Sequence, residues 1–360
     1  DTIQDFAAVD GAIAFPYLQV FWSVNNRAAN GNDADGDIGT SSYTRVSGVP
    51  TVKVLGDANS DTDEYDSHVV VHEFGHYFED QISRSDSIGG SHSLSQRLDP
   101  RVAFGEGFGN ALSGMILDDP FYRDSNNASQ ASGFSINVES NNYANEGWYN
   151  EGSIQSILYD IYDASNDGAD VISGGLEPIY NTLTRTDYIN NSFFTTIFAF
   201  TDRLRAEGAV SGTDLTALLA AQSINGAGLN GAGETNNAGQ ADTLPVYKTV
   251  TVGGGAVQVC SSDQNGEYNK LRNRAYLTFS IAAAGSYTLT MTRTSGDTGR
   301  DPDFVVYQGQ TIIDIAQDAP AETETTTRTL SVGEYVVDAY DAENTSGSSP
   351  GDSCYDFTVQ

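Results

Sequence analysis

Basic residues are scarce in this sequence. The 360-residue chain holds 17 lysines and arginines against 49 aspartates and glutamates, which gives a formal net charge of −32. A surface this acidic repels nucleic acid and anionic membranes. We therefore expect no nucleic-acid partner, and the composition favours a protein kept soluble outside the cell.

Long apolar runs are also missing, so we expect no membrane span. The chain begins DTIQDFAAVD, without an initiator Met and without the charged and apolar regions of a signal peptide. We interpret it as the mature form of a secreted protein whose leader has been removed. A monomer is the simplest expectation for its oligomeric state.

Cysteine is nearly absent, since only Cys260 and Cys354 occur. They lie near the start and the end of one strand-rich region, and a disulfide between them is the natural inference. Such a bridge would add about 4–5 kcal/mol of stability in the chain-entropy model, and it needs an oxidising compartment. The alternative is two free buried thiols.

The hydrophobic period divides the chain into two parts. Up to about residue 225, apolar residues recur at helical spacing in segments such as SHVVVHEFGHYFEDQISR and PRVAFGEGFGNALSGMIL. Eight short runs rich in Val, Thr and Tyr then alternate with period two and predict a β-sandwich. We expect a multidomain α+β protein with a mainly helical domain (1–228), a Gly- and Asn-rich linker (229–245) and an all-β domain (246–360).

Two of the four histidines stand in the stretch VVVHEFGHYFED, residues 69–80. On a helix, His72 and His76 project from one face one turn apart, so both imidazoles can reach one metal ion. Glu73 would then lie beside the open position of that ion. Because histidine is so rare here, this spacing is poorly explained by chance, and it predicts a metal site with its own base.

Catalytic zinc normally takes three protein ligands. The remaining histidines, His68 and His92, have no standard spacing from the motif. Glu106 is the better candidate, because Asp99 as N-cap and Pro100 at the first helical position start a second helix that would carry its carboxylate inward. A solvated helix carboxylate is the alternative.

Four glycines between residues 105 and 114 lower the helix propensity of this second segment. They suggest close packing against another backbone, as two metal-bearing helices would need. Asn110 follows Glu106 by four residues on the same face, where it could hydrogen-bond the outer nitrogen of a ligating histidine.

HEFGH followed by GEGFGN resembles the gluzincin zinc metallopeptidases, and most of all the fungalysin and thermolysin groups. NEGSIQSILYDIYD is similar to the helix that follows the second motif in fungalysin-like enzymes. The resemblance covers roughly residues 60 to 165 and implies a zincin-type catalytic domain. It implies His72, His76 and Glu106 as zinc ligands and Glu73 as the general base that takes a proton from water.

Two departures from that family pattern matter. The usual acidic partner of the ligand is Asn110 here, and no histidine follows His92 to stabilise the transition state. Another donor is therefore needed, and a tyrosine hydroxyl is the obvious substitute. We expect Tyr149 in this role, with Tyr143 and Tyr159 as the other choices. The alternative is that these tyrosines belong to the core or the cleft wall.

The strands of residues 246–360 resemble the bacterial pre-peptidase C-terminal domain, a secreted β-sandwich attached to peptidases. GSYTLTMTR, DPDFVVYQG and CYDFTVQ carry this similarity. It implies that the cysteines join an early strand to the last one.

These patterns together predict a secreted zinc endopeptidase of bacterial type that acts on protein or peptide substrates. A zinc exopeptidase or glycoprotein-directed peptidase of narrow specificity is one alternative. A non-catalytic adhesin or binding protein with a structural zinc is another, favoured by the missing downstream histidine.

Two acidic stretches invite a calcium interpretation. Asp33, Asp35 and Asp37 resemble a calcium loop, although the EF-hand register fails at its first and twelfth positions. The run DANSDTDEYD before the first motif either orders a loop around calcium or places negative charge at a helix N-terminus. A solvated acidic turn is the alternative for Asp33, Asp35 and Asp37.

Overall fold

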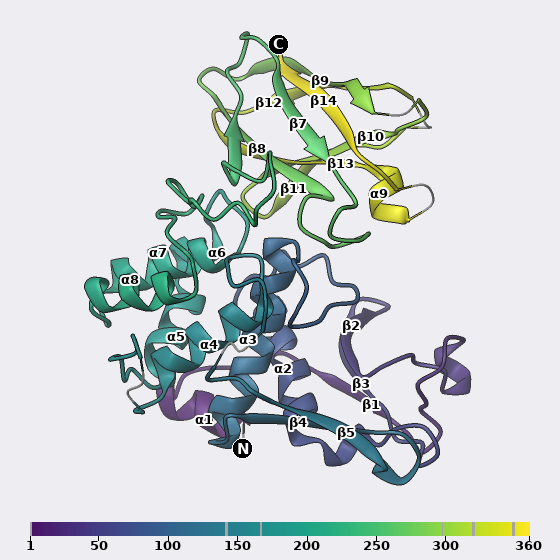
Figure 1. The fold of residues 1–360 in the computed structure, drawn as a ribbon, viewed down its shortest axis with the longest axis vertical. Helices are drawn as coiled ribbons and strands as arrows, with labels where there is room; N and C mark the ends of the chain where they lie inside the picture. The colour runs from purple at the N-terminus through teal and green to yellow at the C-terminus, as the bar shows by residue number, and fades with distance from the viewer. Residues whose placement is uncertain (1, 141–142, 166–167, 297, 319–320, 348–349) are drawn as a thin grey trace.

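The computed structural model describes residues 2–140, 143–165, 168–296, 298–318, 321–347 and 350–360. They form a helical part that carries two small sheets and, stacked on it, a part built almost wholly of strands (Figure 1). The expected α+β class is confirmed. The helices are α1 (Thr2–Val9), α2 (Ser67–Gln81), α3 (Pro100–Leu117), α4 (Glu151–Tyr162), α5 (Leu176–Thr184), α6 (Thr186–Ile189), α7 (Ile197–Glu207), α8 (Gly212–Ala221) and α9 (Ala342–Ser346), with 3-10 turns η1 (Asp33–Asp35), η2 (Asp63–Tyr65) and η3 (Ala128–Gln130).

Two small sheets accompany the helices of the first part. β3 (Val49–Val54) pairs parallel with β1 (Gln19–Trp22) and antiparallel with β2 (Ser42–Val46), so β2 is an edge strand. β4 (Phe121–Asn126) and β5 (Ser132–Asn137) form a hairpin. The hydrophobic periodicity did not predict β1 and β5, because β1 has no buried residue and β5 has one.

The helix α3 starts as its sequence signals predict. Asp99 is the N-cap, its carboxylate accepts from the backbone N–H of Arg101 at 3.0 Å, and Pro100 is the first helical residue. Asp66 stands at the same place before α2 but makes no capping hydrogen bond. Its carboxylate instead accepts from the backbone and hydroxyl of Ser125 in β4.

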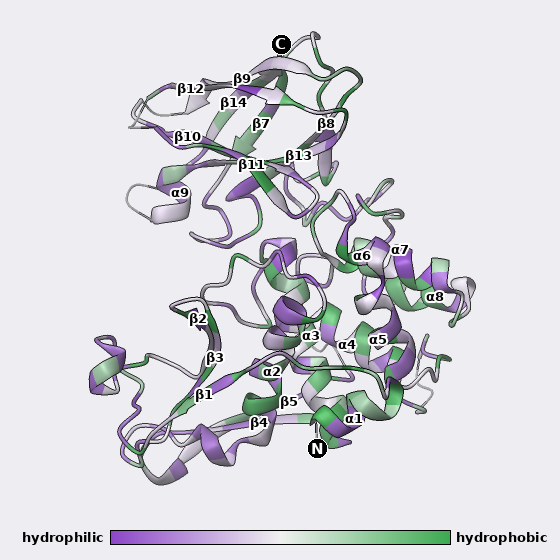
Figure 2. Ribbon diagram, turned by 180° about the vertical axis from the view of Figure 1, so that it is seen from behind, coloured by the Kyte–Doolittle hydropathy of each residue, from purple (hydrophilic) through white to green (hydrophobic). Residues whose placement is uncertain are grey.

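The helices α2 and α3 cross at glycines. A Cβ built on Gly75 would lie 3.2 Å from the Cα of Gly109, and one built on Gly109 would lie 2.8 Å from the imidazole of His72. On the other side of α3, a Cβ at Gly107 would meet Ile154 of α4 at 2.5 Å. The glycines thus let three helices approach closely, and hydrophobic residues gather on the central helices α3 and α4 (Figure 2). None of the described helices is both long and apolar enough to cross a membrane.

The C-terminal part consists of two sheets that enclose one core. Their strand orders are β11-β10-β13-β8-β6 and β12-β9-β14-β7. Side chains of both sheets meet between them, as where Phe304 and Phe357 approach to 5.3 Å between ring centroids. The sandwich is therefore confirmed. Its strands are β6 (Tyr247–Thr249), β7 (Val257–Ser261), β8 (Arg274–Ile281), β9 (Gly285–Gly296), β10 (Pro302–Gln308), β11 (Thr311–Ala316), β12 (Thr323–Leu330), β13 (Gly333–Asp341) and β14 (Ser353–Val359). β11 was not among the eight predicted strands.

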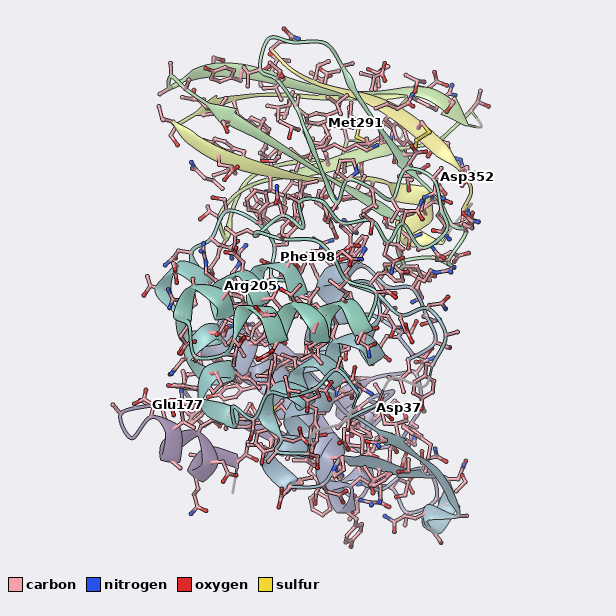
Figure 3. The ribbon with its side chains drawn as sticks, turned by 60° about the vertical axis from the view of Figure 1, so that its left-hand side comes forward. Asp37, Glu177, Phe198, Arg205, Met291 and Asp352 are labelled. Atoms are coloured by element: carbon pink, nitrogen blue, oxygen red, sulfur yellow. A yellow bond between two sulfur atoms is a disulfide. The ribbon has the colours of Figure 1, made fainter. Side chains whose placement is uncertain are left out.

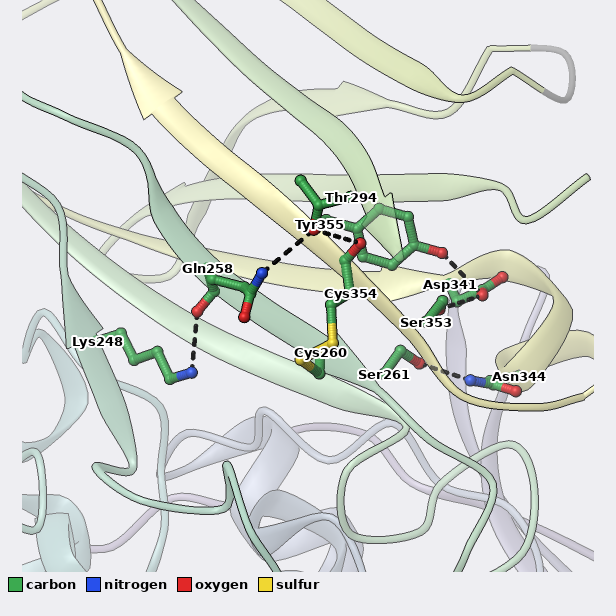
Figure 4. Close-up of a disulfide and its surroundings, with 10 residues drawn as sticks. All are labelled: Lys248, Gln258, Cys260, Ser261, Thr294, Asp341, Asn344, Ser353, Cys354 and Tyr355. Atoms are coloured by element: carbon green, nitrogen blue, oxygen red, sulfur yellow. Dashed lines mark hydrogen bonds between the residues drawn. A yellow bond between two sulfur atoms is a disulfide. The ribbon is translucent and has the colours of Figure 1, made fainter. Parts of the chain in front are cut away.

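The disulfide between Cys260 and Cys354 is also confirmed. The two cysteines face each other in the antiparallel pair β7–β14 (Figure 4). The bridge therefore joins an early strand of the sandwich to the last one, as expected.

The sandwich packs on the helical part through its five-stranded sheet. Tyr247, Tyr276 and Val336 belong to the same hydrophobic core as the helices. At the centre of this contact, the guanidinium of Arg101 lies 3.0 Å from Asp99 and 3.0 Å from Asp338 of β13. Both parts thus share one buried interface.

The predicted linker 229–245 is fixed against the helical part. Glu234 accepts hydrogen bonds from four backbone N–H groups, including those of Gly226 and Asn236, at 2.7–2.9 Å. The indole of Trp148 donates to the carbonyl of Asn236 at 3.0 Å. The segment 229–245 is therefore not a free connection between the two parts, and its glycines serve tight turns.

Candidate metal centre and cleft

Three donor atoms converge where α2 crosses α3. Nε2 of His72 lies 3.1 Å from Nε2 of His76, and these atoms lie 3.2 and 3.3 Å from Oε2 of Glu106. His72 and His76 are one helical turn apart on α2, and Glu106 comes from the middle of α3. The helix crossing at Gly75 and Gly109 brings the two elements close enough for this contact.

The spacing of these donor atoms suits a zinc ion. Tetrahedral bonds of about 2.0–2.1 Å place neighbouring donors about 3.3 Å apart, and the three observed separations are 3.1–3.3 Å. Two imidazoles and one carboxylate also form a donor set that catalytic zinc sites use. The residues present therefore fit the ion that the sequence predicts.

Further side chains orient these donors from behind. Oδ1 of Asn110 lies 2.9 Å from Nδ1 of His72, and its amide donates to Gln155 of α4 at 3.0 Å. Oε2 of the fully buried Glu79 lies 3.6 Å from Nδ1 of His76. The hydrogen bond between Nδ1 of His72 and Asn110 leaves Nε2 of that ring available to a metal, and the carboxylate of Glu79 lies near the outer nitrogen of His76.

Glu73 faces the same space from α2. Its Oε2 accepts a hydrogen bond of 2.6 Å from the backbone N–H of Tyr43 in the edge strand β2. Glu73 is only 8% exposed, but it lines the cleft in front of the donor atoms. A carboxylate placed this way can exchange a proton with a water in the cleft.

His92 enters the centre from the loop between α2 and α3. Its Nε2 lies 3.1 Å from Oε2 of Glu106, and its Nδ1 lies 2.6 Å from Oε2 of Glu151, the first residue of α4. The sequence pattern did not identify His92 as a site residue, because its spacing from the motif is not standard. The only signal for it was the rarity of histidine in the chain.

The centre is electrostatically suited to a positive charge. Burial opposes the charged form of His76, but the charge and hydrogen bond of Glu106 outweigh it and raise the pKa of this histidine. Burial likewise raises the pKa of Glu106, but His76 and His72 outweigh it, so the pKa falls well below its usual range. For His92, the hydrogen bond with Glu151 overcomes burial and raises the pKa to about 9.

A cleft of about 1150 Å³ opens over these residues. Residues 40–43, which lead into the start of β2, form one wall, the loop from Ser85 to Ser95 another, and the β4–β5 hairpin contributes Tyr122 and Phe134.

Tyr149 does not reach the cleft, which corrects the expectation that it stabilises the transition state. Its side chain is 2% exposed, and its hydroxyl lies 3.0 Å from Oδ1 of Asn236 and 3.3 Å from the carbonyl of Glu146. Tyr149 therefore anchors the segment 229–245. Of the two other candidates, Tyr143 lines the cleft and Tyr159 does not.

The aspartates of the expected calcium loop also have other partners. Asp33 pairs with Lys53, and Asp37 pairs with Arg27 at 2.6 Å (Asp37 is labelled in Figure 3). The carboxylates of Asp33, Asp35 and Asp37 do not converge, since these residues are absent from the groups of converging donors in the described part of the chain. The structure thus gives Asp33, Asp35 and Asp37 no shared cation site.

Comparisons with solved structures find only remote similarity. The pre-peptidase C-terminal domain of a collagenase from Bacillus anthracis is 16% identical, over 32% of this chain and 94% of that one, with a TM-score of 0.24. A surface-associated copper-binding protein of Methylomicrobium album BG8 is 10% identical, over 32% and 98%, with a TM-score of 0.23. A periplasmic inhibitor of g-type lysozyme from Aeromonas hydrophila is 15% identical, over 32% and 99%, with a TM-score of 0.19. Scores this low carry no conclusion about function, and no curated protein matches the sequence.

One protein family matches the chain directly. The Mycolysin C-terminal domain matches residues 33–219, just over half of the chain, and this range contains His72, Glu73, His76, His92 and Glu106. The family is associated with secreted peptidases. The chain therefore belongs to the family of the Mycolysin C-terminal domain and is a peptidase-related protein.

Proposed function

We propose that this protein is a secreted zinc endopeptidase. The observation that carries the proposal is the triangle of Nε2 of His72, Nε2 of His76 and Oε2 of Glu106, with sides of 3.1–3.3 Å, at the base of a large cleft. Membership in a peptidase-associated family supports it. A purely structural zinc site would have no use for the carboxylate of Glu73 beside it.

The chain's own residues supply the proton transfers. Zinc held at this site would act as a Lewis acid toward the scissile carbonyl and lower the pKa of a water. Glu73, held by the N–H of Tyr43, takes a proton from the attacking water and passes it to the leaving amine. Asn110 keeps the imidazole of His72 in the tautomer that presents Nε2 to the ion, and the carboxylate of Glu79 lies near the outer nitrogen of His76.

His92 takes the role that the sequence gave to Tyr149. Glu151 accepts the proton on Nδ1, and Nε2 of the same ring lies 3.1 Å from Oε2 of Glu106, beside the candidate zinc site in the cleft. A protonated imidazole there donates a charged hydrogen bond to the oxyanion that forms during attack on the carbonyl. The carboxylate of Glu151 favours the charged form of this ring, because its hydrogen bond raises the pKa of His92.

The edge strand β2 favours cleavage within long chains. Its residues line the cleft, and an edge strand can pair with an extended peptide through backbone hydrogen bonds. Such pairing recognises a peptide backbone without needing a free terminus. This supports an endopeptidase over the exopeptidase alternative.

The decisive experiment compares the wild type with Glu73→Gln for cleavage of unfolded casein, with the zinc content of both measured. We expect the variant to keep its zinc and to lose at least about 10³-fold in kcat/KM, because the proton acceptor is gone. Glu177→Gln is the matched control, since Glu177 is exposed at the start of α5 away from the cleft (Figure 3).

Equal cleavage by wild type and Glu73→Gln would refute the assigned base. Absence of cleavage by the zinc-loaded wild type, on casein and on short peptides alike, would favour the non-catalytic binding protein. Cleavage confined to the ends of short peptides would favour the exopeptidase.

A further inference from the structure

A second group of acidic side chains lies just before the N-terminus of α2. It contains Asp61, Asp63 of η2 and Asp124 of β4, each of which offers one carboxylate oxygen, and these oxygens all lie within 4.8 Å of one another. Asp63 and Asp124 also line the cleft. Three carboxylates this close repel one another unless positive charge or protons lie among them.

One carboxylate oxygen of Asp63 has no hydrogen-bond partner among the described residues. The residue is 4% exposed, and its Oδ2 accepts a hydrogen bond from the hydroxyl of Ser41. The same hydroxyl accepts from the N–H of Leu55 at 2.9 Å, which fixes its direction. Oδ1 of Asp63 is buried and has no hydrogen-bond partner in the part of the chain that the structure describes. A buried carboxylate oxygen of this kind calls for a ligand.

No basic side chain of the described residues pairs with this group. Arg123 precedes Asp124 but pairs with Asp119, and among the described residues no salt bridge reaches Asp61, Asp63 or Asp124. Burial, together with the neighbouring carboxylates, raises the pKa of Asp63 to about 7 and that of Asp124 to about 6. The local field is therefore strongly negative and uncompensated.

We propose that Asp61, Asp63 and Asp124 bind a calcium ion. The donors are all carboxylate oxygens, which select hard cations over zinc. Oxygens within 4.8 Å of one another can share one ion with bonds of about 2.4 Å, the length that calcium takes, and calcium tolerates irregular geometry. This site goes beyond the peptidase function and does not depend on zinc chemistry.

The ion would join segments that are distant in sequence. Asp61 and Asp63 precede the helix that carries His72 and His76, whereas Asp124 belongs to the hairpin that forms one wall of the cleft. Asp66 already ties the same segments by accepting two hydrogen bonds from Ser125. Calcium would complete this connection and fix the cleft wall relative to the metal-bearing helix.

Calorimetric titration tests the site directly. Calcium chloride is titrated into the full, zinc-loaded chain after prior removal of calcium, with the zinc content measured before and after. We expect Asp124→Asn and Asp61→Asn to reduce the number of bound calcium ions by one or to weaken one site at least tenfold. Asp35→Asn is the control, because it removes the same charge from the acidic turn at residues 33–37 and should leave binding unchanged. The Tm of the wild type should rise by several degrees in about 10 mM calcium, and that of either site variant by less.

The proposal is overturned if the wild type shows no saturable calcium binding, or if both site variants bind as the wild type does. Loss of binding in Asp35→Asn alone would assign the ion to the turn at residues 33–37. Equal affinity for magnesium chloride would overturn the choice of calcium. Because none of these readouts is catalytic, they stay separate from the fate of the peptidase proposal.

Discussion

The imidazole of His92 joins two carboxylates, Glu106 on one side and Glu151 on the other. This bridge fixes the orientation of the ring, and the two carboxylates raise its pKa. Its side chain is 32% exposed, so a substrate can reach it, whereas the side chains of Glu106 and Glu151 are 8% and 3% exposed. A cationic donor placed beside a metal centre is well suited to a developing negative charge.

His92→Gln is therefore expected to lower kcat/KM for casein by about 10²–10³-fold while the zinc content stays that of the wild type. Glutamine keeps a hydrogen-bond donor but loses the charge. Steady-state kinetics with metal analysis measure both quantities, and His68→Gln controls for loss of a histidine outside the cleft. A parallel loss of zinc would instead make His92 a ligand, and unchanged kinetics would remove it from the reaction.

Local spacing explains which site residues the sequence could predict. His72, Glu73 and His76 lie within five positions on one helix, so helix geometry alone places them together. His92 comes from an irregular loop, and the N–H of Tyr43 and the carboxylate of Asp124 come from strands elsewhere in the chain. Only tertiary structure brings such groups together. For the same reason the sequence misplaced Tyr149. It is close to the second motif in sequence, but its hydroxyl hydrogen-bonds Asn236 in the segment 229–245.

At the scale of elements, the crossing of α2 and α3 sets the geometry of the candidate metal centre. The closest approach is at Gly75 and Gly109, and the imidazole of His72 occupies the space that a side chain at 109 would need. A methyl group there would displace the ring from Asn110 and from its place opposite Glu106.

Gly109→Ala should therefore weaken zinc binding about 10–100-fold and destabilise the fold by about 1–3 kcal/mol. Competition with a chelator measures the zinc affinity, and urea unfolding measures the stability. Gly212→Ala is the control, because nothing lies within 4 Å of a Cβ at this position in α8. If both variants bind zinc equally well, the crossing does not set the position of His72.

The elements that the sequence predicted well are those with a strong burial pattern. The helices α2, α3 and α4 and most strands of the sandwich alternate clearly between buried and exposed positions or are buried throughout. The strands β1 and β5 escaped because most of their side chains are exposed. The strand β11 escaped because its buried positions are Asp314 and Ala316, whereas Ile312 and Ile315 are exposed. Without a buried face, a short strand leaves little periodic signal.

At the scale of the whole molecule, Arg101 connects the two parts. Its guanidinium is buried between Asp99 of the helical part and Asp338 of the sandwich, and it stacks on Phe194 and Tyr276 at 4.6 and 5.1 Å. Tyr276 donates to Asp99 at 2.6 Å. Burial raises the pKa of Asp99, but the charge and hydrogen bonds of Arg101 outweigh it, so this pKa is lowered.

Arg101→Met should destabilise the protein by about 3–5 kcal/mol at pH 7, because two carboxylates would remain buried without their partner. A lowered folded pKa contributes stability above the unfolded value of about 4 and loses it as the pH falls through the folded value. The difference between wild type and variant should therefore shrink below about pH 4. Urea unfolding at pH 7, 5 and 3 measures it, with Arg203→Met as a surface control. A difference that stays constant with pH would contradict this account of Asp99.

The disulfide closes most of the sandwich chain into a covalent ring. Cys260 and Cys354 lie 94 residues apart and enclose all of the chain from β8 to β13. A single backbone cut anywhere inside this ring leaves both pieces attached to the same molecule. A nick by a peptidase in any loop between β7 and β14 therefore opens the ring without releasing a fragment, and only a second cut or a reductant can release one.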